Sequence, residues 1–256
     1  MSLASALPLY KTSIVSVFGN SGNTAPGAGS DIGSATKDWA ISGVPMTSHT
    51  GTLAPGQAVA GFVTSSPGAV SGTGLGGIDS ASPGAGLSAV KTVLIADLTT
   101  LFQNINNTPV AAADGFTQAV NSFFSAAKIM TNFTGVMPPG AAVPGPAGPV
   151  GVGTYTGAAE TGGVDSPSGS GFSATLTPFQ SSLTSTFSNT ANTAPVAAQG
   201  IADACETFFL SAMVSMTSST GTAGGGPAVV AVPAGTGSTG PLGSPIISGS
   251  GTGTLS

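Results

Sequence analysis

Charged residues are scarce in this sequence of 256 residues. It has four Lys, no Arg and nine Asp or Glu, so that 5% of its residues are charged, against about 25% in a typical soluble domain. Four scattered Lys cannot neutralise a nucleic-acid backbone, and binding to DNA or RNA is not expected. A free monomer with so few charges should be poorly soluble. The composition therefore favours a surface that is covered in an assembly; the alternative is that Ser, Thr, Asn and Gly hydrate it well enough.

Cysteine is nearly absent too, and the single Cys205 cannot form an intramolecular disulfide. Its place in a helical pattern predicts a small buried side chain. The N-terminus has no basic segment ahead of an apolar run, so a secretory signal is not expected. No run of about 18 apolar residues is free of Gly and Pro, so no membrane span is expected either. We expect the protein to stay in the cytoplasm in which it is made until it is assembled.

What the sequence does contain is one motif in three copies. The copies begin at Asn20, Asn104 and Asn189, and each reads Asn-x-x-Asn-Thr followed by Pro or Ala-Pro. Offsets of 84 and then 85 residues align the flanking apolar positions without gaps. Such a period predicts one module used three times, with boundaries near residues 1–85, 86–170 and 171–256.

Each module is expected to open with an antiparallel helical hairpin. In the middle copy, apolar residues recur at steps of three and four over residues 87–105 and again over 110–130. Pro8 and Pro178 are expected to shorten or kink the first helix of the outer copies. The matched core positions are Tyr10/Leu94/Phe179, Ile14/Leu98/Leu183, Phe18/Phe102/Phe187, Ile32/Phe116/Ile201, Ala35/Ala119/Ala204 and Trp39/Phe123/Phe208.

Three features of these hairpins lead to specific expectations. The Asn residues close the first helix and Thr caps the second, so turn chemistry explains the motif better than ligand binding does. Trp39 is expected in the core, with a binding role as the alternative. Phe123 lies on the core stripe and Phe124 beside it, so truncating Phe124 is expected to destabilise the fold less.

Beyond the helices, the composition changes to Gly, Pro, Thr and Ser over residues 47–86, 131–170 and 217–256. Short pieces with strand character interrupt these segments at 58–63, 151–156 and 228–232. The recurrence of Asp-Ser after Ile78 and Val164 favours partly ordered arms over flexible linkers. The fold class that follows is mainly α with irregular or β arms, arranged as a pseudo-threefold set of three modules.

Residues with catalytic chemistry are few. His49 is the single His, and the matching positions hold Phe133 and Ser219, so a repeated Ser-His-Asp triad is impossible. Glu160 and Asp165 are too isolated for paired acid–base carboxylates. No Cys/His cluster can hold zinc, and the Gly-rich run 72–77 lacks the ending of a phosphate loop. The sequence predicts no enzyme, no catalytic, cofactor-binding or metal-binding residues, and no small-molecule substrate.

The chain resembles small Gly/Thr-rich virion structural proteins of tailed bacteriophages, in which a short Ala-rich helical region precedes a Thr-Gly-rich terminal segment. The segments that carry the resemblance are 220–229 and 250–255, with looser versions at 46–61 and 130–145. It implies a non-enzymatic structural part of the virion, in the tail, baseplate or neck. The implied partners are other structural proteins of the particle, of three- or six-fold symmetry, which the arms would contact by adding strands.

A second reading from a different class stays open. A secreted or surface-exposed Gly/Thr-rich binding protein, such as an adhesin, would have a similar composition. The lack of a secretory signal and the scarcity of charge favour the particle component.

Overall fold

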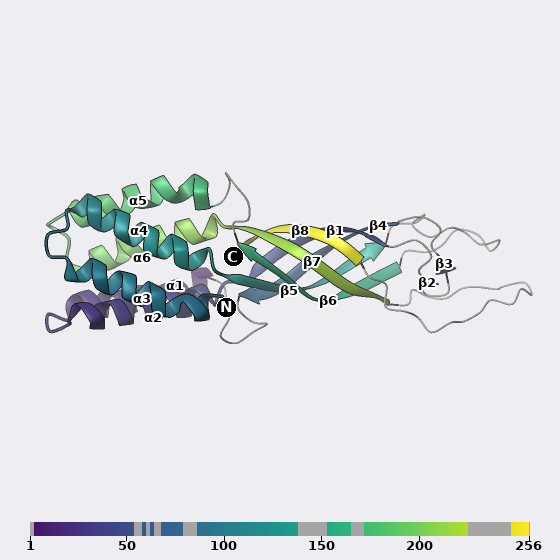
Figure 1. Cartoon of the computed structure of the whole chain (residues 1–256), viewed down its shortest axis with the longest axis horizontal. Coiled ribbons are helices and arrows are strands. Elements are labelled where there is room, and N and C mark those ends of the chain that lie inside the picture. Colours follow the sequence, from purple (N-terminus) through teal and green to yellow (C-terminus); the bar gives the residue numbers. More distant parts are fainter. Residues whose placement is uncertain are drawn as a thin grey trace, which may run out of the picture.

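The computed structural model describes residues 3–53, 58–59, 62–63, 68–78, 86–137, 153–164, 172–224 and 247–255. This part of the chain is mostly helical, and it forms a helical bundle and a slender β-barrel that stand end to end (Figure 1). The turns between paired helices lie at the end of the bundle that faces away from the barrel. Both ends of the chain lie where the bundle meets the barrel.

Six helices form the bundle. They are α1 (Leu3–Gly19), α2 (Ala25–Ala40), α3 (Leu87–Gln103), α4 (Pro109–Phe124), α5 (Phe172–Ser188) and α6 (Ala194–Leu210). Helices α1 and α2 pack together as a hairpin, as do α3 and α4, and α5 and α6. In addition, α2 packs on α3, α4 on α5, and α6 on α1. The three hairpins therefore close into a ring.

Two predicted helix limits are wrong. In the middle hairpin, α4 ends at Phe124 and a strand starts at Lys128, although the sequence pattern extended the helix to residue 130. Ala127 stays buried after the helix has ended, which is why the apolar period continued past the true end. The expected shortening at proline is also absent, because Pro8 and Pro178 lie inside α1 and α5. Buried residues ahead of each proline, Leu3 and Phe172, hold these first turns by tertiary packing.

The core of the bundle contains the expected apolar positions. Trp39 is confirmed as a core residue at 2% exposure, and Cys205 is confirmed as buried. The positions that match Cys205, Thr36 and Val120, are buried as well. The outermost matched set is the exception: Phe18 is 38% exposed, because it lies next to the turn at the free end of the bundle.

A second apolar stripe was missed by the sequence pattern. Phe124 and its matches Ala40 and Phe209 are all fully buried. The rings of Phe124 and Phe209 stack with centroids 4.2 Å apart, and the Trp39 ring lies against both, at 6.1 and 5.7 Å. The small Ala40 leaves room for the large Trp39 beside it. The placement of Phe124 beside the core is therefore wrong, because a second helix in a closed ring buries a wider face than a single stripe. We expect truncation of Phe124 to destabilise the fold more than truncation of Phe123.

The barrel has six described strands, all antiparallel to their neighbours. They are β1 (Pro45–Leu53), β4 (Gly68–Ile78), β5 (Lys128–Met137), β6 (Gly153–Val164), β7 (Met213–Gly224) and β8 (Ile247–Leu255). Each strand pairs with the next along the chain, and β8 pairs with β1 to close the barrel. A barrel of six strands is narrower than one of eight, whose interior is just filled by side chains. This narrowness is a physical reason for the many Gly residues in these strands.

The Gly-rich segments thus form more regularly paired strands than the irregular or β arms that the sequence predicted. Of the three strand-like pieces, the first forms the short antiparallel pair β2 (Ala58–Val59) and β3 (Phe62–Val63), and the second overlaps the start of β6. The third, 228–232, lies outside the described residues. In the barrel, every described strand has two partners within the chain. These strands therefore present no open edge to which a neighbouring protein could add a strand.

Candidate functional site

No cluster of catalytic or metal-binding side chains is found in the described residues. Nowhere in them do three or more His, Cys, Asp or Glu side chains gather to hold a metal ion. His49 lies in β1 and Glu160 in β6, whereas Asp165 lies outside the described part. Among the described helices, none has the length and apolar character that crossing a membrane requires.

The three Asn-x-x-Asn-Thr turns are the most repeated polar feature, and their polar groups bond to one another. In the middle turn, Asn104 donates to Asn107 Oδ1 at 2.9 Å, and Asn107 donates to the Leu101 carbonyl at 3.0 Å. The third turn repeats both bonds. Thr108 accepts from the Ala111 amide as an N-cap, and Thr24 accepts from the Gly27 amide in the first hairpin. The expected cap bond is absent at Thr193. These bonds account for the motif as turn chemistry.

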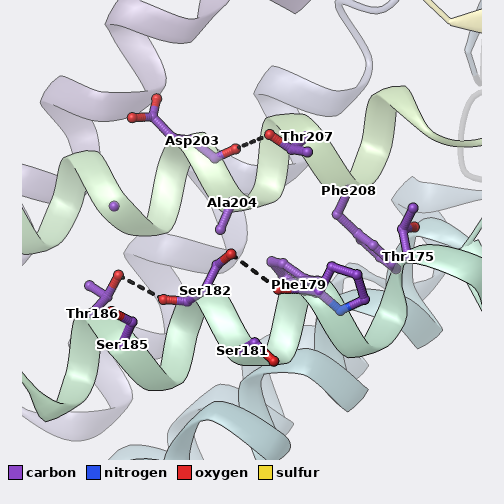
Figure 2. A pocket seen from close by; sticks show the side chains of 12 residues that line it. Thr175, Phe179, Ser181, Ser182, Ser185, Thr186, Asp203, Ala204, Thr207 and Phe208 are labelled. Carbon is purple, nitrogen blue, oxygen red and sulfur yellow. Dashed lines mark hydrogen bonds between the residues drawn. The ribbon is translucent and has the colours of Figure 1, made fainter.

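An open groove runs along the outer face of the third hairpin, between α5 and α6 (Figure 2). It has a volume of about 590 Å³, and the stacked rings of Phe179 and Phe208, with centroids 4.5 Å apart, lie along it. Some of its hydroxyl groups donate within their own helices. Ser182 donates to the Pro178 carbonyl, and Thr207 donates to the Asp203 carbonyl.

A matching groove of about 530 Å³ lies between α3 and α4. Its lining residues Asp97, Thr100 and Gly115 match Ser182, Ser185 and Gly200 of the first groove. The repeated groove is therefore a product of how two helices of one hairpin pack.

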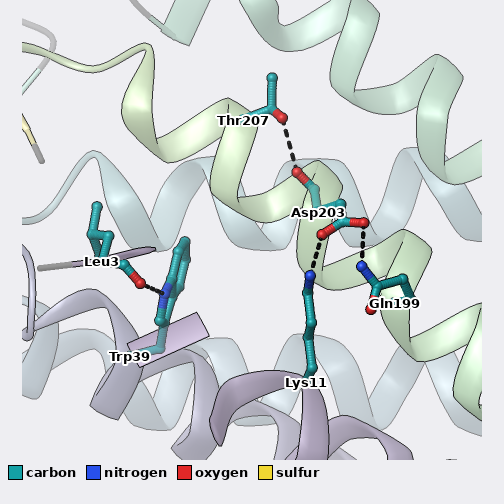
Figure 3. Close-up of polar contacts among 6 residues, drawn as sticks. All are labelled: Leu3, Lys11, Trp39, Gln199, Asp203 and Thr207. Atoms are coloured by element: carbon teal, nitrogen blue, oxygen red, sulfur yellow. Dashed lines mark hydrogen bonds and ion pairs between the residues drawn. The ribbon is translucent and has the colours of Figure 1, made fainter. Parts of the chain in front are cut away.

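Polar contacts gather where α1 meets α6 (Figure 3). The Lys11 ammonium group lies 2.6 Å from Asp203 Oδ1, and Gln199 donates to the other carboxylate oxygen at 2.7 Å. Both charged side chains remain partly exposed, so solvent screens the pair and its contribution to stability is small. Nearer the barrel, the Trp39 indole donates to the Leu3 carbonyl at 3.1 Å, which satisfies the one polar atom of this buried ring.

A buried polar cluster lies behind this contact. Tyr10 stacks on Trp39 with centroids 4.9 Å apart, and its hydroxyl lies 3.0 Å from Thr36 Oγ1. Burial raises the pKa of the Cys205 thiol from its ordinary value of 9.0 to about 12, although a hydrogen bond from Tyr10 lowers it slightly. Burial also raises the pKa of Tyr10 well above its ordinary value. Burial thus favours the neutral form of both groups, and a neutral thiol is a poor nucleophile.

We expect these two groups to make the fold sensitive to alkali. Both pKa values are raised by folding, so the stabilisation is complete below pH 9 and is lost as the pH rises toward 12. The free energy of unfolding should fall by about 1.4 kcal/mol between pH 8 and pH 10 from Cys205 alone, because the unfolded thiol ionises there and the folded one does not. Urea titrations at the two pH values measure the difference.

The matched control for this prediction is Cys205→Val, since Val120 occupies the equivalent place in α4. This variant should lose most of the decrease between pH 8 and pH 10. An unchanged decrease in the variant would show that other groups cause it.

No protein-family model, curated protein or solved structure matches this chain in the comparisons made. The function therefore has to be argued from the residues and contacts described above.

Proposed function

We propose that the chain is a non-enzymatic structural component of a tailed bacteriophage or phage-like particle, in its tail, baseplate or neck. In this proposal the three modules form a covalent pseudo-trimer that sits on or near a three- or six-fold axis of the particle. A homotrimer places three identical modules around an axis. This chain would place three similar ones there, joined by peptide bonds.

The observation that carries the proposal is the combination of a threefold internal repeat with a closed ring of three hairpins. Each hairpin packs on both of the others, and the barrel strands follow the same cyclic order. The molecule is elongated, and the turns of its hairpins lie together at one end (Figure 1). In this proposal the three modules present related surfaces around the long axis. Such surfaces suit partners that are themselves arranged with three- or six-fold symmetry.

The free end of the bundle supports the proposal through its composition. Residues 17–27, 101–111 and 186–197, which form the three turns and the adjoining helix ends, include no charged residue. Several apolar side chains are exposed there: Ile105 is 92% exposed, Val110 58% and Val196 54%. Exposed apolar side chains on an uncharged surface are a common property of contact sites between proteins.

Localisation provides the direct test. Particles are purified from a culture that expresses the chain, and mass spectrometry compares them with the cleared culture supernatant. We expect the chain to co-purify with the particles. Recovery from the supernatant without particles would favour the adhesin-like alternative instead.

A separate experiment tests whether the Gly/Pro/Thr-rich segments dock on other proteins of the particle. A deletion of residues 217–256 would remove β8 and most of β7 and so open the barrel. Deleting only residues 228–243 keeps both strands and leaves 225–227 and 244–246 to connect them, which is long enough for a hairpin loop. We expect the helical circular dichroism to persist and incorporation into particles to be lost.

The matched control scrambles the order of residues 228–243 at constant length and composition. If both this variant and the deletion are incorporated normally, the segment has no docking role. The localisation test is unaffected by that outcome.

A further inference from the structure

One position of the first helix of each hairpin contacts the hairpin before it in a different way in each copy. Residues 11, 95 and 180 are equivalent by the sequence register, and we call them the interface position. Lys11 forms its ion pair with Asp203 of α6. Gln180 donates to Asp114 of α4 at 3.2 Å. Ile95 packs on α2, where a Cβ added at Gly33 would lie 2.7 Å from its Cγ1 atom.

At the α2–α3 interface, the two helices lie too close together for side chains at two positions of α2. Besides Gly33, a Cβ at Gly29 would lie 2.9 Å from the Thr99 backbone nitrogen and 3.1 Å from the Ile95 carbonyl oxygen. Both glycines are buried. Helix α3 therefore approaches α2 more closely than side chains at these two positions would permit.

The other two second helices lack this surface. Ala113 and Thr117 of α4 stand in place of Gly29 and Gly33, and so do Ala198 and Ala202 of α6. All four are buried at their own interfaces, so their side chains already fill the space into which Ile95 projects on α2. Helix α3 with Ile95 fits α2, and overpacking would oppose its docking on α4 or α6.

A ring of three hairpins has two possible cyclic orders, and the fit of Ile95 against α2 favours one of them. In a ring of three, every hairpin touches both of the others, so chain connectivity by itself leaves both orders open. In the observed order α3 docks on α2. In the reverse order α3 would dock on α6, and Ile95 would face Ala198, Ala202 and the Asp203 carboxylate. One exclusive interface is enough to decide between the two orders.

We propose that the Ile95–Gly29–Gly33 contact, together with the Lys11–Asp203 and Gln180–Asp114 pairs, encodes the cyclic order of the three hairpins. The three copies have diverged at the interface position so that each first helix recognises one second helix. The pseudo-trimer is thereby a ring of one defined hand with three distinguishable faces. This inference concerns the fold alone and stands whether or not the chain belongs to a virus particle.

Crosslinking reports the order directly. Lys11→Cys with Asp203→Cys places two partly exposed thiols across the α6–α1 interface of the observed order. Lys11→Cys with Gln118→Cys reports the reverse order, because Gln118 is the match of Asp203 on α4, which lies three helices away from α1 in the observed ring. Each protein is unfolded, refolded in dilute solution and treated with a short bis-maleimide. The native Cys205 is buried and neutral and does not compete.

The decisive variant gives the α2–α3 interface the residues of the α4–α5 interface. It carries Gly29→Ala, Ser30→Asp, Gly33→Thr and Ile95→Gln, a set that already packs in this protein at 113, 114, 117 and 180. With the native interface we expect mainly the 11–203 product and only a trace of the 11–118 product. In the variant the share of the 11–118 product should rise about 10- to 100-fold, in line with the overpacking that it removes.

The matched control is Val93→Gln, an apolar-to-Gln change on the exposed side of the same helix, which should leave the product ratio unchanged. If the variant yields the 11–203 product alone, the barrel and the chain connections set the order and the proposal is wrong. Loss of helical circular dichroism in the variant would also overturn the proposal, since it treats the interfaces as interchangeable apart from these residues.

Discussion

Replacing Phe124 by Ala should lower the free energy of unfolding by about 3–5 kcal/mol, the usual range for a Phe in a core. Phe124 is fully buried and stacks on Phe209 from another hairpin. It also contacts the rings of Trp39, Phe172 and Phe208 at centroid distances of 6.1 to 6.3 Å. Truncation would remove contacts to both other hairpins at once. Urea denaturation followed by circular dichroism measures the loss.

The stability lost in Phe124→Ala is best compared with that lost when the adjacent Phe123 is replaced by Ala. Phe123→Ala should cost less, because its ring contact with Phe124 is within its own hairpin and the contacts between hairpins remain. Ile105→Ala serves as a surface control; at 92% exposure it should change stability by less than about 0.5 kcal/mol. A larger loss for Phe123→Ala than for Phe124→Ala would show that the aromatic cluster does not hold the hairpins together.

Adding a single methyl group to Gly29 should destabilise the protein by about 1–3 kcal/mol, the usual cost of overpacking. A Cβ there would meet the Thr99 backbone nitrogen at 2.9 Å and the Ile95 carbonyl oxygen at 3.1 Å. Backbone atoms of a packed helix cannot move aside independently, so α2 and α3 would have to separate. Thermal or urea unfolding of Gly29→Ala detects this loss.

Two related variants test the geometric reason. Gly33→Ala should be rescued by Ile95→Ala in a double-mutant cycle, since the atom that it meets belongs to the flexible Ile95 side chain. Gly29→Ala should not be rescued in this way. As a control, Gly19→Ala meets no atom within 4 Å and should leave stability unchanged or slightly raised. A neutral effect of Gly29→Ala would mean that the helices are not in close contact there.

The helical part of this fold could be predicted from local chemistry. The steps of three and four located all six helices, and Thr before Pro identified the start of α2 and α4 because capping is a property of a few adjacent residues. The expectation of turn chemistry at Asn104 and Asn107 is matched by the bonds that these residues form. Buried Trp39 and Cys205 also followed from their places in the pattern.

The candidate sites and contacts also include features that could be predicted from the sequence and features that could not. The absence of catalytic and ligand-binding residues stays a prediction of the sequence. The contacts of Ile95 with Gly29 and Gly33 could not be read from the sequence. A buried glycine and a buried alanine look alike in a periodic pattern, and only the position of the neighbouring helix shows that a methyl group would not fit.

The sequence by itself determined its own repeat period, the positions of the hairpins and one apolar stripe of each helix, because these depend on residues that are near one another in the chain. The tertiary structure alone decided that the hairpins close into a ring, that Phe124 and Phe209 meet in it, and that the Gly-rich strands pair into a barrel that β8 closes on β1. Two of these contacts, Phe124 with Phe209 and β1 with β8, join residues more than 80 positions apart. Strand pairing in particular uses the backbone N–H and C=O groups. Almost every residue has both, so a Gly- and Thr-rich segment does not specify by its sequence which strand it pairs with.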